Sequence, residues 1–377
     1  MPPAVTPQPQ ALAMRDLRDA SRCGAADPDV IAATEARIPT GDADAWLREW
    51  TQAGGAAWAA AKRTADAALY RHAASYYAAA LAAIADSDGS VDEAQLWQRQ
   101  RDCWDRAVSL AGGEQVSVPY EGARLRGYFL SGGPGRRPLV VIDHGGRALI
   151  SQAWTLAGAA AHARGYHWMT FDGPGRQAAL CREGLVLRPD WEAVLAPVAD
   201  AVLARADVDG SRVAIVGSDL AGFGVARGLA YEQRFVAAVA APGIVEAARP
   251  WLAALPSAAR AALHDDDRAA FDRELHLADL FAPRTSVGLR RAAEGFGPPG
   301  LPLYDLFQRM RAYTLGDETS RIATPLLVCA ATGDGAAEAL WPGQSCELWE
   351  RLGAPVGRFL EAAGPETILD WLDRHLL

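Results

Sequence analysis

The chain has 377 residues, half of them hydrophobic, and a formal net charge of −9 from 37 basic and 46 acidic side chains. This length allows about two or three domains with a sizeable core, and the absence of a basic block argues against nucleic acid as a partner. The five cysteines lack C-x-x-C spacing, which argues against a zinc site or a disulfide framework. No apolar run approaches the roughly 18 residues of a membrane span, and no secretory leader is recognisable, so we expect a cytoplasmic protein that does not enter a membrane.

The first part of the chain is predicted to be helical. Residues 1–10 are rich in proline and glutamine, and we expect them to be disordered. Residues 11–112 are predicted to form an N-terminal helical domain, because apolar residues recur at helical spacing in 43–50, 56–84 and 91–111. The tryptophans within these segments favour the packed face of a helical layer over a ligand-binding aromatic box.

From residue 113 the pattern changes to short apolar runs that alternate with helical stretches. Alternating strands and helices predict an α/β fold, with a mostly parallel sheet covered by helices on both faces. We assign this core to residues 113–243 and 323–377, and we expect it to open with an antiparallel pair joined by a turn at 120–122. The predicted strands are Gln115–Pro119, Arg124–Leu130, Leu139–Asp143, His167–Phe171, Arg212–Gly217, Phe235–Ala240, Leu326–Ala331 and Val356–Leu360.

The alternation stops between residues 244 and 322, where the sequence is mostly helical and is broken by Pro298-Pro299-Gly300. An insertion after a strand in the middle of the sheet lies where a lid would cover the substrate. We therefore predict a helical lid over residues 244–322.

One apolar strand runs directly into a turn of small residues, Gly217-Ser218-Asp219-Leu220-Ala221. A strand, a sharp turn and an immediate helix form a nucleophile elbow, whose usual pattern is G-x-S-x-G. The residue at the tip is therefore Asp219, where serine is usual. Ser218 lies one position earlier, and we interpret it as a turn residue.

Further short motifs accompany the elbow. They are Tyr70 to Tyr77, Pro119-Tyr120-Glu121-Gly122, Gly145-Gly146, Phe171-Asp172-Gly173-Pro174-Gly175, Pro189-Asp190-Trp191-Glu192 and Tyr313-Thr314-Leu315 followed by Pro325-Leu326-Leu327. With these motifs the chain resembles the α/β-hydrolase superfamily from about residue 40 onward. More narrowly, it is similar to the branch with an N-terminal helical domain, which includes 2,6-dihydroxypseudooxynicotine hydrolase and FrsA-like proteins. The resemblance implies hydrolysis of C–C bonds or esters by a Ser-His-Asp arrangement.

The sequence departs from that arrangement at two positions. Asp219 replaces the serine, while Asp334 is the expected acid after the penultimate strand. The histidine expected after the last strand is missing, because residues 361–366 contain Pro365 in its place. His375 follows only near the end of the terminal helix, where we expect it to be exposed. A serine-type hydrolase is therefore not expected, since the Ser-His pair is lost.

A carboxylate at this tip is suited to proton transfer. It lies beside the N–H of Leu220 and the loop of Gly146 and Arg147, which would form the oxyanion hole. A base next to such donors favours removal of a proton α to a carbonyl. The N–H groups lower the pKa of a carboxylate and burial raises it, and the sequence leaves the outcome open.

Other candidate residues lie on the same rim of the sheet. Arg147 and Arg176 follow glycine-containing loops, where a guanidinium would bind an enolate, a carboxylate or a departing acid, or would pair with a surface carboxylate. His144 is either a polar pocket residue or a satisfied core histidine. Glu246 is a second acid/base candidate, with the beginning of a lid helix as the alternative role.

We therefore hypothesise an enzyme of bacterial secondary metabolism, a lyase that acts by base-promoted elimination. One example is the loss of acetate from an acetylated tetronate or β-dicarbonyl, as in hydrolase-like proteins of tetronate antibiotic pathways. The alternative is a hydrolase of a C–C bond, ester or epoxide that uses Asp219, with His264 or His276 of the lid in place of the missing histidine. A third hypothesis is a non-catalytic protein that kept the fold. We expect a small-molecule substrate, no metal or cofactor, and a homodimer as a candidate assembly.

Overall fold

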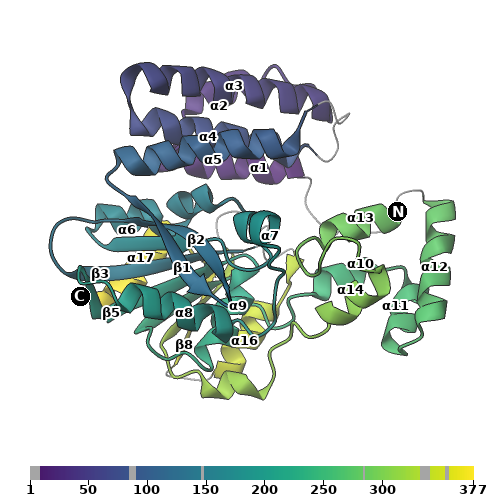
Figure 1. The fold of residues 1–377 in the computed structure, drawn as a ribbon. Coiled ribbons are helices and arrows are strands. Elements are labelled where there is room, and N and C mark those ends of the chain that lie inside the picture. Colours follow the sequence, from purple (N-terminus) through teal and green to yellow (C-terminus); the bar gives the residue numbers. More distant parts are fainter. Residues whose placement is uncertain (1–8, 85–90, 146–147, 283–284, 332–339, 353–355) are drawn as a thin grey trace.

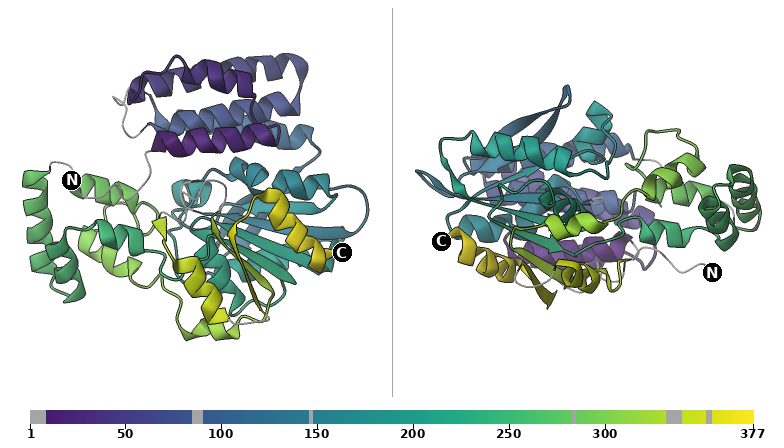
Figure 2. Two further views of the ribbon diagram at one scale, coloured as in Figure 1. Left: turned by 180° about the vertical axis from the view of Figure 1, so that it is seen from behind. Right: turned by 90° about the horizontal axis from the view of Figure 1, so that it is seen from below.

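The computed structural model describes residues 9–84, 91–145, 148–282, 285–331, 340–352 and 356–377. It shows a layer of helices above a sheet-containing core, with a lobe of further helices at one side (Figure 1). Figure 2 shows the same lobe extending sideways from the core in two other views. Among the described helices, none combines the length and the apolar character needed to cross a membrane.

Five helices of the described part of the chain form the upper layer. They are α1 (Pro9–Arg22), α2 (Pro28–Glu35), α3 (Ala43–Thr64), α4 (Ala67–Ala82) and α5 (Glu93–Leu110).

The details of this layer differ from the expected helices. Helix α1 begins at Pro9, so the disorder expected through residue 10 does not extend that far, while residues 1–8 lie outside the described range. Residues 56–84, where helical spacing was noted, contain the end of α3 and the whole of α4. Ala65 adopts a left-handed φ of 53°, and the Asp66 side chain caps α4 by accepting from the backbone N–H of Ala68. Ala65 is not the glycine that usually ends a helix in this conformation, so the sequence signal for the break is limited to the N-cap Asp66.

The core contains an eight-stranded sheet with the order β1-β2-β4-β3-β5-β6-β7-β8. β2 pairs antiparallel with β1 and β4, and the remaining neighbours are parallel. The predicted α/β fold class is confirmed, and each predicted strand overlaps an observed one. The strands are β1 (Glu114–Tyr120), β2 (Ala123–Leu130), β3 (Arg137–His144), β4 (His167–Phe171), β5 (Val208–Ser218), β6 (Ala237–Ala241), β7 (Leu326–Ala331) and β8 (Gly357–Ala362).

Side chains alternate between the two faces of the central strands, and each face has its own core. Leu139 and Val141 of β3 pack with α8 (Glu192–Leu203), α9 (Ala221–Leu229) and α16 (Gln344–Leu352). The intervening residues of β3 pack instead with the upper helical layer. That face is completed by η1 (Ile150–Gln152), η2 (Trp154–Gly158), α6 (Ala159–Ala163) and α17 (Pro365–Leu376).

The lateral lobe joins the core through two antiparallel segments. The N–H of Ala247 donates to the carbonyl of Tyr313 at 2.9 Å, and the N–H of Leu315 donates to the carbonyl of Val245 at 2.8 Å. This pairing fixes both ends of the lobe beside the sheet. Its helices are α10 (Arg249–Ala254), α11 (Ser257–His264), α12 (Arg268–Phe281), α13 (Thr285–Ala292) and α14 (Leu303–Met310), followed by η3 (Asp317–Arg321).

Candidate active site

The turn between β5 and α9 has the geometry of an elbow. Asp219 adopts a φ of 52°, a left-handed conformation that is unfavourable for a residue other than glycine. Its N–H donates to the carbonyl of Ala241 at 3.0 Å, and its carbonyl accepts from the N–H of Gly222 at 2.8 Å. These two bonds hold the turn on both sides, so Asp219 occupies the tip between strand and helix.

Glycine at two nearby positions allows the backbone to approach the elbow. A Cβ on Gly145 would clash with the backbone nitrogens of Leu220 and Ala221, and one on Gly222 would clash with the carbonyl oxygen of Pro242. The loop after β3 can therefore lie against the start of α9 only without a side chain at Gly145. The next two residues, Gly146 and Arg147, were expected in the oxyanion hole and lie outside the described residues, as does Asp334.

The carboxyl group of Asp219 is electrostatically unusual. Burial raises its pKa from the ordinary 3.8 to about 6, although the Arg176 guanidinium, the Leu220 N–H and Arg15 each lower it. Asp16 acts in the opposite direction, as expected of a second negative charge. The residue keeps some exposed surface while protein surrounds the carboxyl group. A carboxylate with this pKa is ionised at neutral pH and is a stronger base than an ordinary aspartate.

Arg176, just before α7 (Gln177–Glu183), is buried and fixed in place. Its Nη1 forms an ion pair with Asp143 Oδ1, and the other oxygen of Asp143 accepts from Trp191 Nε1 at 2.8 Å. The guanidinium also lies over the Trp191 ring, 4.9 Å from its centroid. A buried carboxylate therefore orients the guanidinium and balances its charge.

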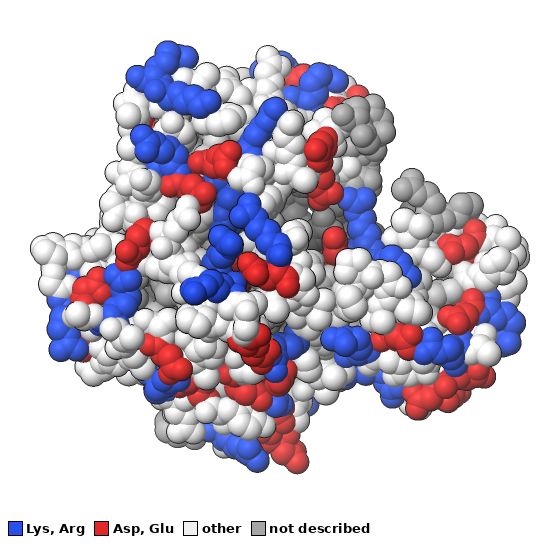
Figure 3. Space-filling model, viewed as in Figure 1, with Lys and Arg blue, Asp and Glu red and all other residues white. Residues whose placement is uncertain are grey.

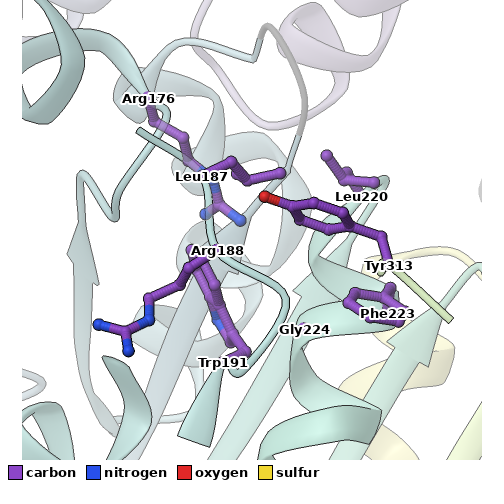
Figure 4. A pocket seen from close by; sticks show the side chains of 8 residues that line it. All are labelled: Arg176, Leu187, Arg188, Trp191, Leu220, Phe223, Gly224 and Tyr313. Atoms are coloured by element: carbon purple, nitrogen blue, oxygen red, sulfur yellow. The ribbon is translucent and has the colours of Figure 1, made fainter. Parts of the chain in front are cut away.

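Arg176 lines a small pocket beside the elbow (Figure 4). The space open to the centre of a water-sized sphere is about 10 Å³, which is room for about one water molecule. The lining residues are Arg176, Leu187, Arg188, Trp191, Leu220, Phe223, Gly224 and Tyr313.

His144 does not line this pocket. Its Nε2 lies 3.5 Å from Asp172 Oδ1, and its Nδ1 lies 3.3 Å from Thr170 Oγ1. Asp172 in turn accepts from Arg101 of α5 at 2.9 Å. Burial alone would raise the pKa of Asp172, but the bonds and charges of His144 and Arg101 together lower it. His144 thus belongs to a buried polar network that links the sheet to the upper helical layer.

Glu246 is also outside the pocket. Its carboxylate is half-exposed and pairs with Arg249 at 3.0 Å, while its N–H donates to the side chain of Gln344 at 2.7 Å. Among the expected site residues, Leu220 and Arg176 line the pocket, and both act on the carboxyl group of Asp219, which adjoins the pocket without being among its lining residues. Glu246 lies at the base of the lobe.

The seven histidines all belong to the described residues, and none makes a hydrogen bond or ion pair with Asp219. His264 and His276 of the lobe are exposed, and His264 interacts with its neighbour Asp265 at 3.2 Å. His375 was expected to be exposed but is half-buried against the Trp371 ring, 4.7 Å between centroids. Neither of these two described histidines of the lobe therefore completes the site.

Sequence reasoning missed a contribution from α1. Asp16 Oδ2 accepts from Gln152 Nε2 at 2.8 Å, and Gln152 Oε1 accepts from the N–H of Leu149 at 2.6 Å. This chain of bonds ties α1 to the loop after β3. The charges of Arg15 and Asp16 on this helix act on the pKa of Asp219. Contacts between residues so far apart in sequence leave no local signal. Among the described residues, no group of three or more histidine, cysteine, aspartate or glutamate side chains is arranged to hold a metal ion.

The strand order, the elbow and the helices on both faces define an α/β-hydrolase fold. No family model matches the chain. Two solved structures share the fold over nearly the whole chain. The 2,6-dihydroxy-pseudo-oxynicotine hydrolase has a TM-score of 0.70 at 16% identity, covering 95% of each chain. Wild-type AbyA5 has a TM-score of 0.61 at 19% identity, covering 94% of this chain and 88% of that one.

Curated relatives are similar in sequence. Hydrolase acrC of Aspergillus aculeatus is 31% identical over 229 residues, 53% of this chain and 54% of that protein. Hydrolyase ccsE of Aspergillus clavatus is 33% identical over 148 residues, 36% of this chain and 34% of that protein. The chain thus spans about half the length, or less, of these relatives. Their names include both hydrolase and hydrolyase, which supports an enzyme.

Figure 3 shows acidic and basic side chains interspersed over one face of the molecule.

Proposed function

We propose that the protein is a lyase of bacterial secondary metabolism in which Asp219 acts as the general base of an elimination. The observation that carries this proposal is the carboxylate at the elbow tip. It has a raised pKa, lies near Arg176 and makes no hydrogen bond to any of the described histidines. The substrate is a small acidic carbonyl compound, such as an acetylated hydroxymethyl tetronate or a related β-dicarbonyl.

The proposed elimination converts the acetoxymethyl group of the substrate into an exocyclic methylene. Asp219 takes the ring proton next to the acetoxymethyl group, and the electrons of that C–H bond form the new exocyclic double bond. The C–O bond to the acetoxy group breaks, and acetate leaves with that electron pair. Negative charge that develops on the carbonyl oxygen is stabilised by the N–H of Leu220 and by Arg176. Asp219 then releases its proton to water.

A base is favoured over a nucleophile for a physical reason. An aspartyl ester formed on Asp219 would have to be hydrolysed by an activated water, and that water normally needs a histidine. The alternative function is nevertheless a hydrolase of an ester, C–C bond or epoxide, which the relatives named hydrolase favour. We further propose that the protein acts on a small molecule in the cytoplasm and does not bind nucleic acid. A homodimer is the proposed assembly, which sedimentation would test.

The test uses the purified protein and a synthetic acetylated hydroxymethyl tetronate. We expect stoichiometric acetate and an exocyclic methylene by NMR, with Asp219→Asn slowing the reaction about 100- to 10,000-fold. A single turnover in ¹⁸O-labelled water should leave the protein unlabelled, whereas label in Asp219 would establish the covalent hydrolase instead. Full activity of Asp219→Asn would remove the residue from catalysis and favour a non-catalytic role for the elbow.

A further inference from the structure

The hydroxyl of Tyr313 is a polar group in the pocket that the proposed reaction does not yet use. The residue is only 2% exposed, and its hydroxyl has no hydrogen-bond partner among the described residues. Figure 4 shows the hydroxyl pointing across the pocket, toward the side where Arg176 and Leu187 lie. A buried hydroxyl without a partner is unfavourable, and native proteins keep few of them.

The position of the Tyr313 ring is fixed by its surroundings. The ring packs edge-on against Phe296 of the lobe at 4.9 Å between centroids, and against Phe223 of α9 at 6.1 Å. Its backbone carbonyl accepts from Ala247 in the segment that anchors the lobe. The hydroxyl is therefore aimed into the pocket by the fold and not by a bond of its own.

A second donor in the same pocket also lacks a partner. Arg176 is 3% exposed and bonds Asp143 through Nη1, but its Nε has no acceptor among the described residues. Burial raises the pKa of Tyr313, so its phenol remains protonated and can donate throughout the physiological range. Arg188 also lines the pocket, but its guanidinium donates to Tyr120, Glu121 and Asp190. Tyr313 and Arg176 are therefore the neutral and the charged donor with hydrogens left for a ligand, an arrangement suited to an anionic oxygen.

We propose that Tyr313 and Arg176 together bind the anionic oxygen of the substrate, the enolate oxygen of a cyclic 1,3-dicarbonyl. This inference deepens the proposed function and rests on it for the substrate class. The flat ring would lie against Leu187, Leu220 and Phe223, with the ring carbon that bears the acetoxymethyl group toward Asp219. Because the pocket holds only about one water molecule, its walls must move apart before the ring can enter.

The test separates binding from turnover by using tetronic acid, an enolate that has no group to eliminate. Calorimetry should show that Tyr313→Phe binds it about 10- to 100-fold more weakly than the wild type. The melting temperature of this variant should be unchanged or higher, because no protein hydrogen bond is lost. Tyr231→Phe is the matched control, since Tyr231 is 44% exposed and is not among the pocket residues. Its affinity for tetronic acid should equal that of the wild type.

Equal binding of tetronic acid by the wild type and Tyr313→Phe would overturn the inference, and so would a lower melting temperature of that variant. Failure of the wild type to bind tetronic acid would also overturn it. Acetate is the second probe. If acetate binds in a Tyr313-dependent manner and tetronic acid does not, the site binds carboxylates, and the assignment to an enolate is overturned. If tetronic acid binds through Tyr313 but no acetylated tetronate is turned over, the proposed elimination fails while the oxyanion site stands.

Discussion

Asp219→Asn should make the protein more stable at neutral and alkaline pH. Folding raises the pKa of the carboxyl from 3.8 to about 6, so the folded state binds the proton more tightly than the unfolded state does. The carboxyl group therefore weakens folding progressively as the pH rises from 3.8 to 6, and by a constant amount above that. Asparagine resembles the protonated form at every pH, and it tolerates the left-handed φ of the elbow better than most residues do.

The size of this effect follows from the shift in pKa. A shift of about 2 units corresponds to about 3 kcal/mol in the free energy of unfolding at pH 8, falling to about 1.5 kcal/mol at pH 5. The upper figure is a limit, because the residue keeps some exposed surface and solvent screens its charge. Urea unfolding of the wild type and Asp219→Asn at pH 5 and pH 8 measures both values.

Asp209→Asn is the control of opposite sign. Bonds from Ser211 and Arg212 hold the pKa of Asp209 at about 2, so its charge supports folding at neutral pH. The Asp209→Asn variant should therefore gain no stability at pH 8. If Asp219→Asn is no more stable than the wild type at pH 8, or if its advantage does not grow between pH 5 and pH 8, then Asp219 is not the raised-pKa base described here.

The same carboxyl should govern the pH dependence of the reaction: kcat/KM should rise with pH to a plateau, with a midpoint near 6. Asp16→Asn should move that midpoint to lower pH, because it removes a negative charge that raises the pKa of Asp219. Arg18→Gln, an exposed change on the same helix, should leave the midpoint unchanged, and pH–rate profiles of the two variants test this. In the helical layer, Gly54→Ala should lower the melting temperature, because its Cβ would lie 2.8 Å from the Tyr77 ring. Gly55→Ala should maintain or raise the melting temperature, because its Cβ would be 3.7 Å from the Tyr77 hydroxyl and alanine favours the helix. A fall in melting temperature equal to that of Gly54→Ala would contradict this packing argument.

The sheet and the elbow could be predicted from the sequence because both are encoded locally. Residues 139–143 are apolar up to Asp143, and the observed strand β3 (Arg137–His144) extends them by only a few residues. The elbow is likewise one continuous stretch in which small residues surround Asp219. Such patterns depend on neighbours along the chain, so a single sequence is enough to recognise them.

The pocket could not be predicted in the same way, because its residues come from separate parts of the chain. Tyr313 was noticed only as part of a short motif of the resemblance, and nothing in that motif indicates which way its hydroxyl points. Asp16 reaches the loop after β3 through Gln152, which lies 136 residues later. His144 and Glu246 follow the ends of their strands as predicted, but neither side chain lines the pocket. His144 interacts with Asp172, and Glu246 pairs with Arg249.

The sequence left open whether burial or the neighbouring N–H groups dominate the pKa of Asp219, and in the structure burial dominates. The N–H of Leu220 and the Arg176 guanidinium favour the carboxylate, but burial outweighs them and raises the pKa. Part of the reason is that Asp143 already neutralises Arg176, so that arginine cannot act on Asp219 as an unpaired charge would. Asp16, brought close by α1, adds further repulsion. Helix α1 therefore acts on the elbow in both directions, because Arg15 lowers the pKa of Asp219 and Asp16 raises it. Removing the charge of Asp16 alone would leave a weaker base at the same position.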